Sequence, residues 1–292
     1  MPLGLRQTGE PLMSRLRLVV LVVLTMIAFA GNSLLCRVAL KATRIDAATF
    51  TTVRIVSGAL ALWLIVRLRD GVRPVAGSWR SALALFAYAA AFSFAYTSLP
   101  AGTGALLLFG AVQATMIGYG LWRGERMRPR QVLGLACASA GLVILTLPGI
   151  SAPPLQGTVL MLGAGIAWGV YSLRGRSTGD PLRATAGNFL RAVPFAVALS
   201  LAAIQWLSLD LGGIGYAVAS GALTSGVGYA IWYTALPGLR ATYAATVQLS
   251  VPVIAAAGGV VFLDEHMTLR LLIAAAAILG GIALVVVVRP AK

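Results

Sequence analysis

The sequence predicts an all-α integral membrane protein of ten transmembrane helices, arranged as two inverted five-helix repeats. Of the 292 residues, 59% are hydrophobic and only 11% are charged. A soluble domain of this size could not cover its surface with so few charges. Apolar stretches of roughly 20 residues, the length that crosses about 30 Å of hydrocarbon, recur along the whole chain. Motifs of the first half also return in the second half.

Ten apolar stretches follow one another with short connections, which leave no room for a soluble domain. They cover residues 18–39, 47–68, 80–97, 101–122, 130–148, 157–173, 185–207, 214–235, 241–263 and 268–288. The predicted organisation is a cytoplasmic N-terminal segment (1–17), a first repeat (18–148), a periplasmic linker (149–156), a second repeat (157–288) and a cytoplasmic tail (289–292).

The net charge of +15 would suggest nucleic-acid binding in a soluble protein, but its distribution indicates a membrane topology. With the N-terminus in the cytoplasm, most of the 23 Lys and Arg residues fall in cytoplasmic segments. The positive-inside rule then places both termini in the cytoplasm and requires an even number of spans. We expect a multi-pass protein of the bacterial inner membrane that functions as a monomer in the lipid bilayer, with no nucleic-acid partner.

Residues 18–30, which end in Ala28-Phe29-Ala30, also fit a signal peptide with a small-residue cleavage site. The apolar stretch continues past Ala30, and nine further spans need an orienting first helix, so a retained helix is favoured. Cys36 and Cys137 both fall inside predicted helices, and they imply no disulfide framework.

The clearest repeated motif is Tyr96–Pro100 (YTSLP), which returns as Tyr233–Pro237 (YTALP). Arg54 and Arg191 match at the same spacing. Each copy therefore has five helices, and an odd number makes the second copy enter the membrane from the opposite side. Inverted copies of this kind recur in transporters, with the binding site near the membrane midplane between them.

The chain resembles the ten-helix EamA-type exporters of the drug/metabolite transporter superfamily, from about residue 18 to 289. The resemblance rests on the two tyrosine motifs, on Trp168-Gly169 in the sixth helix, and on Glu125 and Glu265, which end the fourth and ninth helices. The first helix departs from it, because it carries Phe29-Ala30-Gly31 where the sixth has Trp168-Gly169.

This resemblance implies export of amino acids or other metabolites by alternating access. The YddG-like branch, which the chain also resembles, exports aromatic and other amino acids. The resemblance further implies that the first, third, fourth, sixth, eighth and ninth helices line a central cavity.

Aromatic and amide side chains on these helices are the predicted substrate-binding groups. They are Asn32, Tyr88, Phe92, Gln113, Trp168, Tyr171, Tyr229, Trp232 and Gln248. Tyr88 and Phe92 share one helix face because they are four residues apart. Such a chamber suits a small amphipathic solute with an apolar side chain and a zwitterionic backbone. The alternative is that the aromatic residues form interfacial belts or pack between helices, and this is favoured for Tyr96 and Tyr233, which lie within a turn of a helix end.

Prolines and arginines inside the predicted helices indicate a helix bend, a free backbone carbonyl and the direction of two charged side chains. Pro252 has no amide proton to donate to the Gln248 carbonyl, so the ninth helix should bend there. The freed carbonyl is a candidate group for binding an ammonium or hydroxyl, unless the bend serves packing alone. Arg54 and Arg191 are expected to snorkel toward the near interface rather than to contact a carboxylate substrate.

None of the eight acidic residues lies in the middle of a predicted helix. We therefore expect facilitated diffusion without a buried proton-coupling carboxylate. A proton-driven exporter of drugs or other metabolites and a lipid-linked sugar flippase are the alternatives. The lone His266 lies in a loop and the two cysteines are separated, so we expect no enzyme activity, no metal and no cofactor. The Gly165-x-x-x-Gly169 spacing predicts a close helix-packing face.

Overall fold

The computed structural model of the protein describes residues 14–71, 76–124, 126–149, 152–175, 179–239 and 241–287. All regular elements within these ranges are helical. The α-helices are α1 (Arg15–Ala42), α2 (Ala47–Asp70), α3 (Trp79–Tyr96), α4 (Ala101–Trp122), α5 (Pro129–Thr146), α6 (Leu155–Gly175), α7 (Pro181–Ala202), α8 (Leu211–Val218), α9 (Gly228–Ala235), α10 (Ala241–Gln248), α11 (Ser250–Leu263) and α12 (Leu269–Val287). The short elements are η1 (Ile204–Trp206), the π-helix η2 (Ala219–Val227) and η3 (Leu236–Gly238).

In the described ranges, eight helical segments are long and apolar enough to cross a membrane. α3 and α6 occupy the other two predicted spans and pack against each other. Many large apolar side chains on the outside of the bundle are exposed, for example Leu60 and Trp63 on α2 and Leu272 on α12. An exposed apolar surface of this extent fits a lipid environment.

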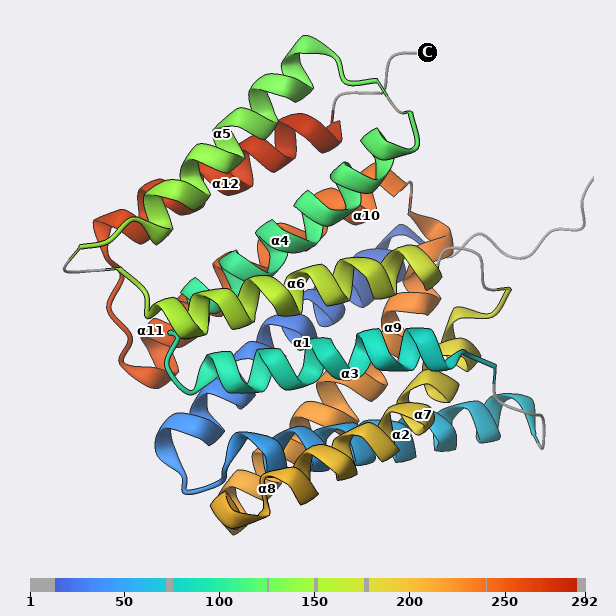
Figure 1. The fold of residues 1–292 in the computed structure, drawn as a ribbon. Helices are drawn as coiled ribbons and strands as arrows, with labels where there is room; N and C mark the ends of the chain where they lie inside the picture. The colour runs from blue at the N-terminus through green and yellow to red at the C-terminus, as the bar shows by residue number, and fades with distance from the viewer. Residues whose placement is uncertain are drawn as a thin grey trace, which may run out of the picture.

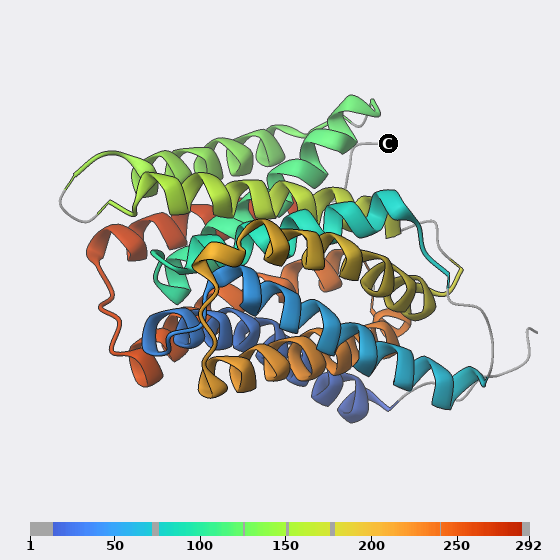
Figure 2. The same ribbon diagram turned by 60° about the horizontal axis from the view of Figure 1, so that its bottom comes forward.

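α5 and α12 lie side by side at one edge of the bundle, and α2 packs with α7 at the opposite edge (Figure 1). Between these edges, α1, α3, α4 and α6 run through the interior (Figures 1 and 2). The close packing predicted for Gly165 and Gly169 is confirmed. A Cβ atom on Gly165 would lie 2.5 Å from the Ala111 Cβ of α4, and one on Gly169 would lie 2.8 Å from the Thr115 Cβ.

The seventh span begins and ends earlier than the predicted 185–207. Asp180 caps α7 through a hydrogen bond from the Arg183 amide, and Pro181 occupies the first turn, where its missing amide proton costs nothing. Pro194 lies inside α7 without ending it.

The eighth span combines three elements rather than one regular helix, because α8 passes through the π-helix η2 into α9. Gly221 in η2 approaches α2 so closely that a Cβ atom on it would lie 2.1 Å from the Arg54 carbonyl oxygen. The extra residue per turn of a π-helix changes which side chains face inward, and such insertions often mark functional sites.

The bend expected in the ninth span appears as a break. α10 ends at Gln248, α11 begins at Ser250, and Leu249 forms a turn with its amide bonded to the Thr246 carbonyl. Pro252 lies in the first turn of α11, where it needs no amide donor of its own. The break leaves Gln248 at the end of a short helix beside the interior of the bundle.

Candidate substrate cavity

A cavity of about 710 Å³ lies in the interior of the bundle between elements of both halves. Its wall is built from α1, α3, α4, α6, α7, η2, α9 and α10. All nine residues predicted to bind a substrate lie on this one wall. α7 was not among the helices expected there. Binding by these residues stays a prediction, since the geometry establishes only that they share a cavity large enough for a small solute.

Trp168 of α6 is the centre of the aromatic part of the wall. Its indole ring lies 4.8 Å from the Tyr88 ring, 5.2 Å from the Tyr171 ring and 5.5 Å from the Tyr229 ring, measured between centroids. The Tyr229 contact is stacked, with 24° between the ring planes. Four aromatic rings from α3, α6 and α9 therefore form one continuous surface.

Asn32 of α1 is fixed by hydrogen bonds on both sides of its amide. Its Oδ1 accepts from the Ser220 hydroxyl at 2.6 Å and from the Thr224 hydroxyl at 3.3 Å. Its Nδ2 donates to the Tyr88 hydroxyl at 3.2 Å. The π-helix places Ser220 and Thr224 on the side that faces α1, so this irregular segment orients a polar group of the cavity.

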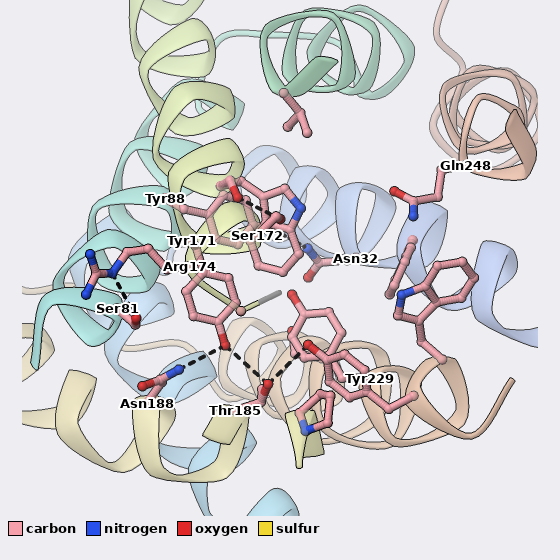
Figure 3. A pocket seen from close by; sticks show the side chains of 18 of the residues that line it. Asn32, Ser81, Tyr88, Tyr171, Ser172, Arg174, Thr185, Asn188, Tyr229 and Gln248 are labelled. Carbon is pink, nitrogen blue, oxygen red and sulfur yellow. Dashed lines mark hydrogen bonds between the residues drawn. The ribbon is translucent and has the colours of Figure 1, made fainter. Parts of the chain in front are cut away.

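A second polar group lies around Tyr171 and Thr185 (Figure 3). The Tyr171 hydroxyl donates to the Thr185 Oγ1 at 3.2 Å and accepts from Asn188 at 3.4 Å. Thr185 in turn donates to the Tyr233 hydroxyl at 3.1 Å. The packing interpretation of Tyr233 was therefore incomplete, because its side chain lines the cavity. It holds for Tyr96, which is fully buried with its hydroxyl donating to the Ala101 carbonyl.

The snorkelling expected of Arg54 was wrong. Its side chain is 2% exposed and points inward, where Nη2 donates to the Tyr88 hydroxyl at 3.0 Å. Arg191 differs, since its Nη1 donates to the backbone carbonyls of Ala76 and Gly187 at 2.9 and 3.0 Å. Matched positions in the two halves therefore have different surroundings. The inward rotamer of Arg54 is stabilised by the Tyr88 hydroxyl and by the rings of Tyr88 and Phe92.

The cavity reaches one end of the bundle. Its lining includes Gly77 and Ser78 before α3, Gly175 at the end of α6 and Pro181 at the start of α7. Arg174 lies at this mouth, where its Nε donates to the Ser81 hydroxyl at 3.1 Å (Figure 3). Under the predicted topology this is the cytoplasmic end.

At the opposite end, hydrogen bonds join α1, the end of α3, the start of α4 and the segment that follows α11. Arg37 forms a salt bridge with Glu265 at 3.2 Å and donates to the carbonyls of Tyr96 and Thr97 at 2.9 and 3.2 Å. The other Glu265 oxygen accepts from the Ala101 amide at 2.8 Å. The cavity lining on α1 stops at Ser33, short of this network. We call these five residues the outer network.

No acidic side chain of the described ranges lies on the cavity wall. Those ranges also contain no group of three or more His, Cys, Asp or Glu residues arranged to bind a metal. Glu125, which carries part of the family resemblance, lies outside the described residues. Arg174 is therefore the one charged residue among the described residues that line the cavity.

Several wall residues were missed from the sequence. Asn188 is an amide inside an apolar stretch, the same signal that pointed to Gln113, and it could have been found. Thr224 and Ser225 are ordinary small polar residues whose hydroxyls can bond the preceding turn of their own helix. Only the π-helix and its approach to α1 distinguish them.

The fold and the cavity define a helical membrane protein built around a chamber of solute size. The chain belongs to the EamA-like transporter family of the drug/metabolite transporter superfamily, whose model matches residues 16–147 and again residues 155–287. It is thus a multi-pass transporter.

The chain is also similar to individual proteins. An uncharacterized protein of Pseudomonas aeruginosa is 58% identical over 274 residues, which cover 94% of this chain and 96% of the relative. The threonine/homoserine exporter RhtA of Salmonella typhimurium is 31% identical over 163 residues, which cover 53% of this chain and 54% of the exporter. One crystal structure superposes with a TM-score of 0.64 at 19% identity, over 93% of this chain and 98% of that one. At this identity it supports the fold alone.

Proposed function

We propose that the protein exports amino acids, aromatic and other amphipathic ones, across the bacterial inner membrane by alternating access. The observation that carries this proposal is the 710 Å³ cavity, whose wall combines a continuous aromatic surface with amide and hydroxyl groups. Aromatic faces accommodate an apolar side chain and attract an ammonium group. The fixed amides and hydroxyls can hydrogen-bond the polar backbone of the solute.

Gln113 on α4 and Gln248 on α10 add two amide groups to the polar part of the wall. In Figure 3 Gln248 lies across the cavity from Arg174 and Tyr171. A solute with polar groups at one end could therefore bond with residues from both halves. Contacts shared between halves are what alternating access needs, because each state must rearrange the two halves around the same solute.

An inverted repeat is supported by helix contacts that recur in matched pairs. α2 packs with α7, α4 with α11 and α5 with α12, and each pair joins equivalent helices of the two halves. The contact of α3 with α6 has its counterpart in the contact of η2 and α9 with α1. The two family matches have nearly equal length. In this arrangement both termini are cytoplasmic, and the protein works as a monomer because the cavity lies within one chain.

Facilitated diffusion is supported by the absence of carboxylates from the described cavity wall. Proton-coupled export of cations commonly uses a carboxylate that binds proton and solute in turn, and the wall offers none for that role. The similarity to RhtA, named as a threonine/homoserine exporter, supports an amino-acid solute.

The decisive experiment loads cells with dipeptides and measures which amino acids leave faster when the protein is expressed. We expect faster efflux of phenylalanine and other amphipathic amino acids than from cells with an empty vector. Faster efflux of organic cations, or flipping of a lipid-linked sugar, with no change for any amino acid would contradict the proposal. In proteoliposomes, uphill accumulation driven by a pH gradient alone would contradict facilitated diffusion.

A further inference from the structure

Arg54 is a cation buried inside the helix bundle, beside the cavity. It lies two turns inside the N-terminal end of α2 and is 2% exposed. Within the described ranges it forms no salt bridge, and its Nη1 has no hydrogen-bond partner. A charged group placed so deep in a membrane protein is costly, and it usually faces a polar pathway or an opposite charge.

Two aromatic rings compensate part of this cost. The guanidinium carbon lies 5.2 Å from the centre of the Tyr88 ring and 4.8 Å from that of Phe92. Both distances are within the range of a cation–π contact. Both rings also line the cavity, so the charge lies directly behind its wall. Aromatic rings attract a cation more weakly than an anion does, and the unpaired Nη1 therefore leaves a positive potential on this part of the wall.

The Tyr88 hydroxyl connects Arg54 to the cavity surface, because it is hydrogen-bonded to Arg54 and polarised by its charge. Its oxygen accepts one hydrogen bond from Arg54 Nη2 at 3.0 Å and another from Asn32 Nδ2 at 3.2 Å. Two donors occupy both lone pairs of a hydroxyl oxygen. Its own proton must then point away from them, and it finds no acceptor among the described residues. A donor polarised by a neighbouring cation makes a stronger hydrogen bond to an anion than a neutral hydroxyl does.

The rest of the wall does not cancel this potential. Among the described residues, its one charged member is Arg174 at the mouth, which is also positive. A solute that enters would pass Arg174 first and then meet Tyr88 and Asn32 deeper inside. Both arginines favour an anionic group and disfavour a purely cationic solute.

We propose that Arg54, acting through Tyr88 and Asn32, forms the subsite for the carboxylate of the transported solute. Tyr88 and Asn32 donate hydrogen bonds to the carboxylate oxygens, and Arg54 is the positioning residue that supplies the compensating charge. This inference deepens the proposed function, on which it rests for the amino-acid class of the solute. It makes a carboxylate a requirement for tight binding, whereas the aromatic surface around Trp168 tolerates different side chains.

The test compares three ligands that share one phenethyl skeleton on the purified full-length protein. They are L-phenylalanine, 3-phenylpropionate, which lacks the ammonium group, and phenethylamine, which lacks the carboxylate. Binding is followed by tryptophan fluorescence, since Trp168 lies on the cavity wall. We expect the two carboxylates to bind at least about tenfold more tightly than phenethylamine, the effect of a charge-assisted hydrogen bond.

Arg54→Gln and Tyr88→Phe should each weaken binding of both carboxylates by about tenfold, and neither should weaken binding of phenethylamine. Arg54→Lys keeps the charge and should keep most of the preference. Arg191→Gln is the matched control, an intramembrane arginine bonded to backbone carbonyls, and it should keep the full preference. If Arg54→Gln does not fold, Tyr88→Phe decides, because it removes one hydroxyl and keeps the ring.

Equal binding of carboxylates and phenethylamine by the wild type would overturn the subsite, as would an Arg54→Gln variant with the full preference. The two proposals can fail separately. Arg54-dependent binding of 3-phenylpropionate in a protein that exports no amino acid would leave the subsite standing and reject the proposed function. Amino-acid export without any Arg54-dependent preference would do the reverse.

Discussion

Replacing Glu265 by glutamine is expected to open the end of the cavity that the outer network closes. Glu265 joins two separate parts of the chain, since one oxygen bonds Arg37 of α1 and the other bonds the Ala101 amide at the start of α4. Glutamine has nearly the same shape but no charge, and its one amide oxygen can accept from Arg37 or from the Ala101 amide but not from both. The substitution therefore weakens the outer network without creating a cavity.

The size of the effect follows from the burial of the pair. The side chains of Arg37 and Glu265 are 12% and 10% exposed, so solvent screens their attraction little. One hydrogen bond between charged groups in such a place contributes about 1.5 to 3 kcal/mol. If the bond exists only in the state with this end closed, its loss shifts the ratio of the two states by about 10- to 150-fold.

Accessibility of a single cysteine at Ser33 measures this shift. Ser33 lines the cavity below the outer network, and Cys36 and Cys137 are first replaced by alanine. A membrane-impermeant thiol reagent added to intact cells should label Ser33→Cys slowly in the parent and at least about tenfold faster with Glu265→Gln.

Asp264→Asn is the matched control, because it changes a neighbouring carboxylate that is exposed and outside the outer network. Asp264 has a left-handed backbone (φ 51°), which asparagine also tolerates. It should leave labelling unchanged. Equal labelling rates for the parent and for Glu265→Gln, with both proteins folded, would refute the view that this network closes the cavity.

Three further predictions follow from particular contacts. Gly165→Ala should destabilise the protein in detergent by about 1 to 3 kcal/mol through overpacking against α4, whereas Gly163→Ala on the same helix, where a Cβ atom meets nothing within 4 Å, should not; equal melting temperatures would contradict this. Trp168→Ala should reduce amino-acid efflux at least about tenfold by removing the central ring of the aromatic surface, whereas the exposed Trp63→Ala should not, and unchanged efflux in folded Trp168→Ala would remove that ring from the site. Burial of Asp46 alone would raise its pKa, but hydrogen bonds from Thr49 and from the amides around it outweigh this effect, so the pKa lies below its ordinary value. The stability that Asp46 contributes is therefore present above about pH 3.9 and is lost as the pH falls through the folded-state pKa. The melting-temperature difference between wild type and Asp46→Asn should accordingly vanish in acid.

Much of the candidate site could be predicted because its residues are unusual for their surroundings. An amide such as Gln113 inside an apolar stretch needs a partner, and aromatic residues spaced by one helical turn share a face. Those two rules, applied to the helices that the family resemblance assigns to the cavity, selected nine residues, and the structure brings all nine to one wall. Ser225 and Met116 also line it, but their residue types are common in any transmembrane helix and carry no such signal.

The sequence by itself determined the helical membrane class and the approximate order and position of the apolar helical segments, although the seventh lies earlier than predicted. It also determined the duplication that Tyr96–Pro100 and Tyr233–Pro237 mark. These features depend on composition and order along the chain, which hydropathy and motifs record directly.

Only the tertiary structure decided which way each side chain faces. The repeat matches the position of Arg54 with that of Arg191, yet one lies behind the cavity wall and the other bonds a loop carbonyl. The π-helix that brings Thr224 to Asn32 likewise has no local signature. The physical reason is that the rotation of a helix about its axis is set by packing against distant helices, and contacts between distant helices are not written in any single stretch of sequence.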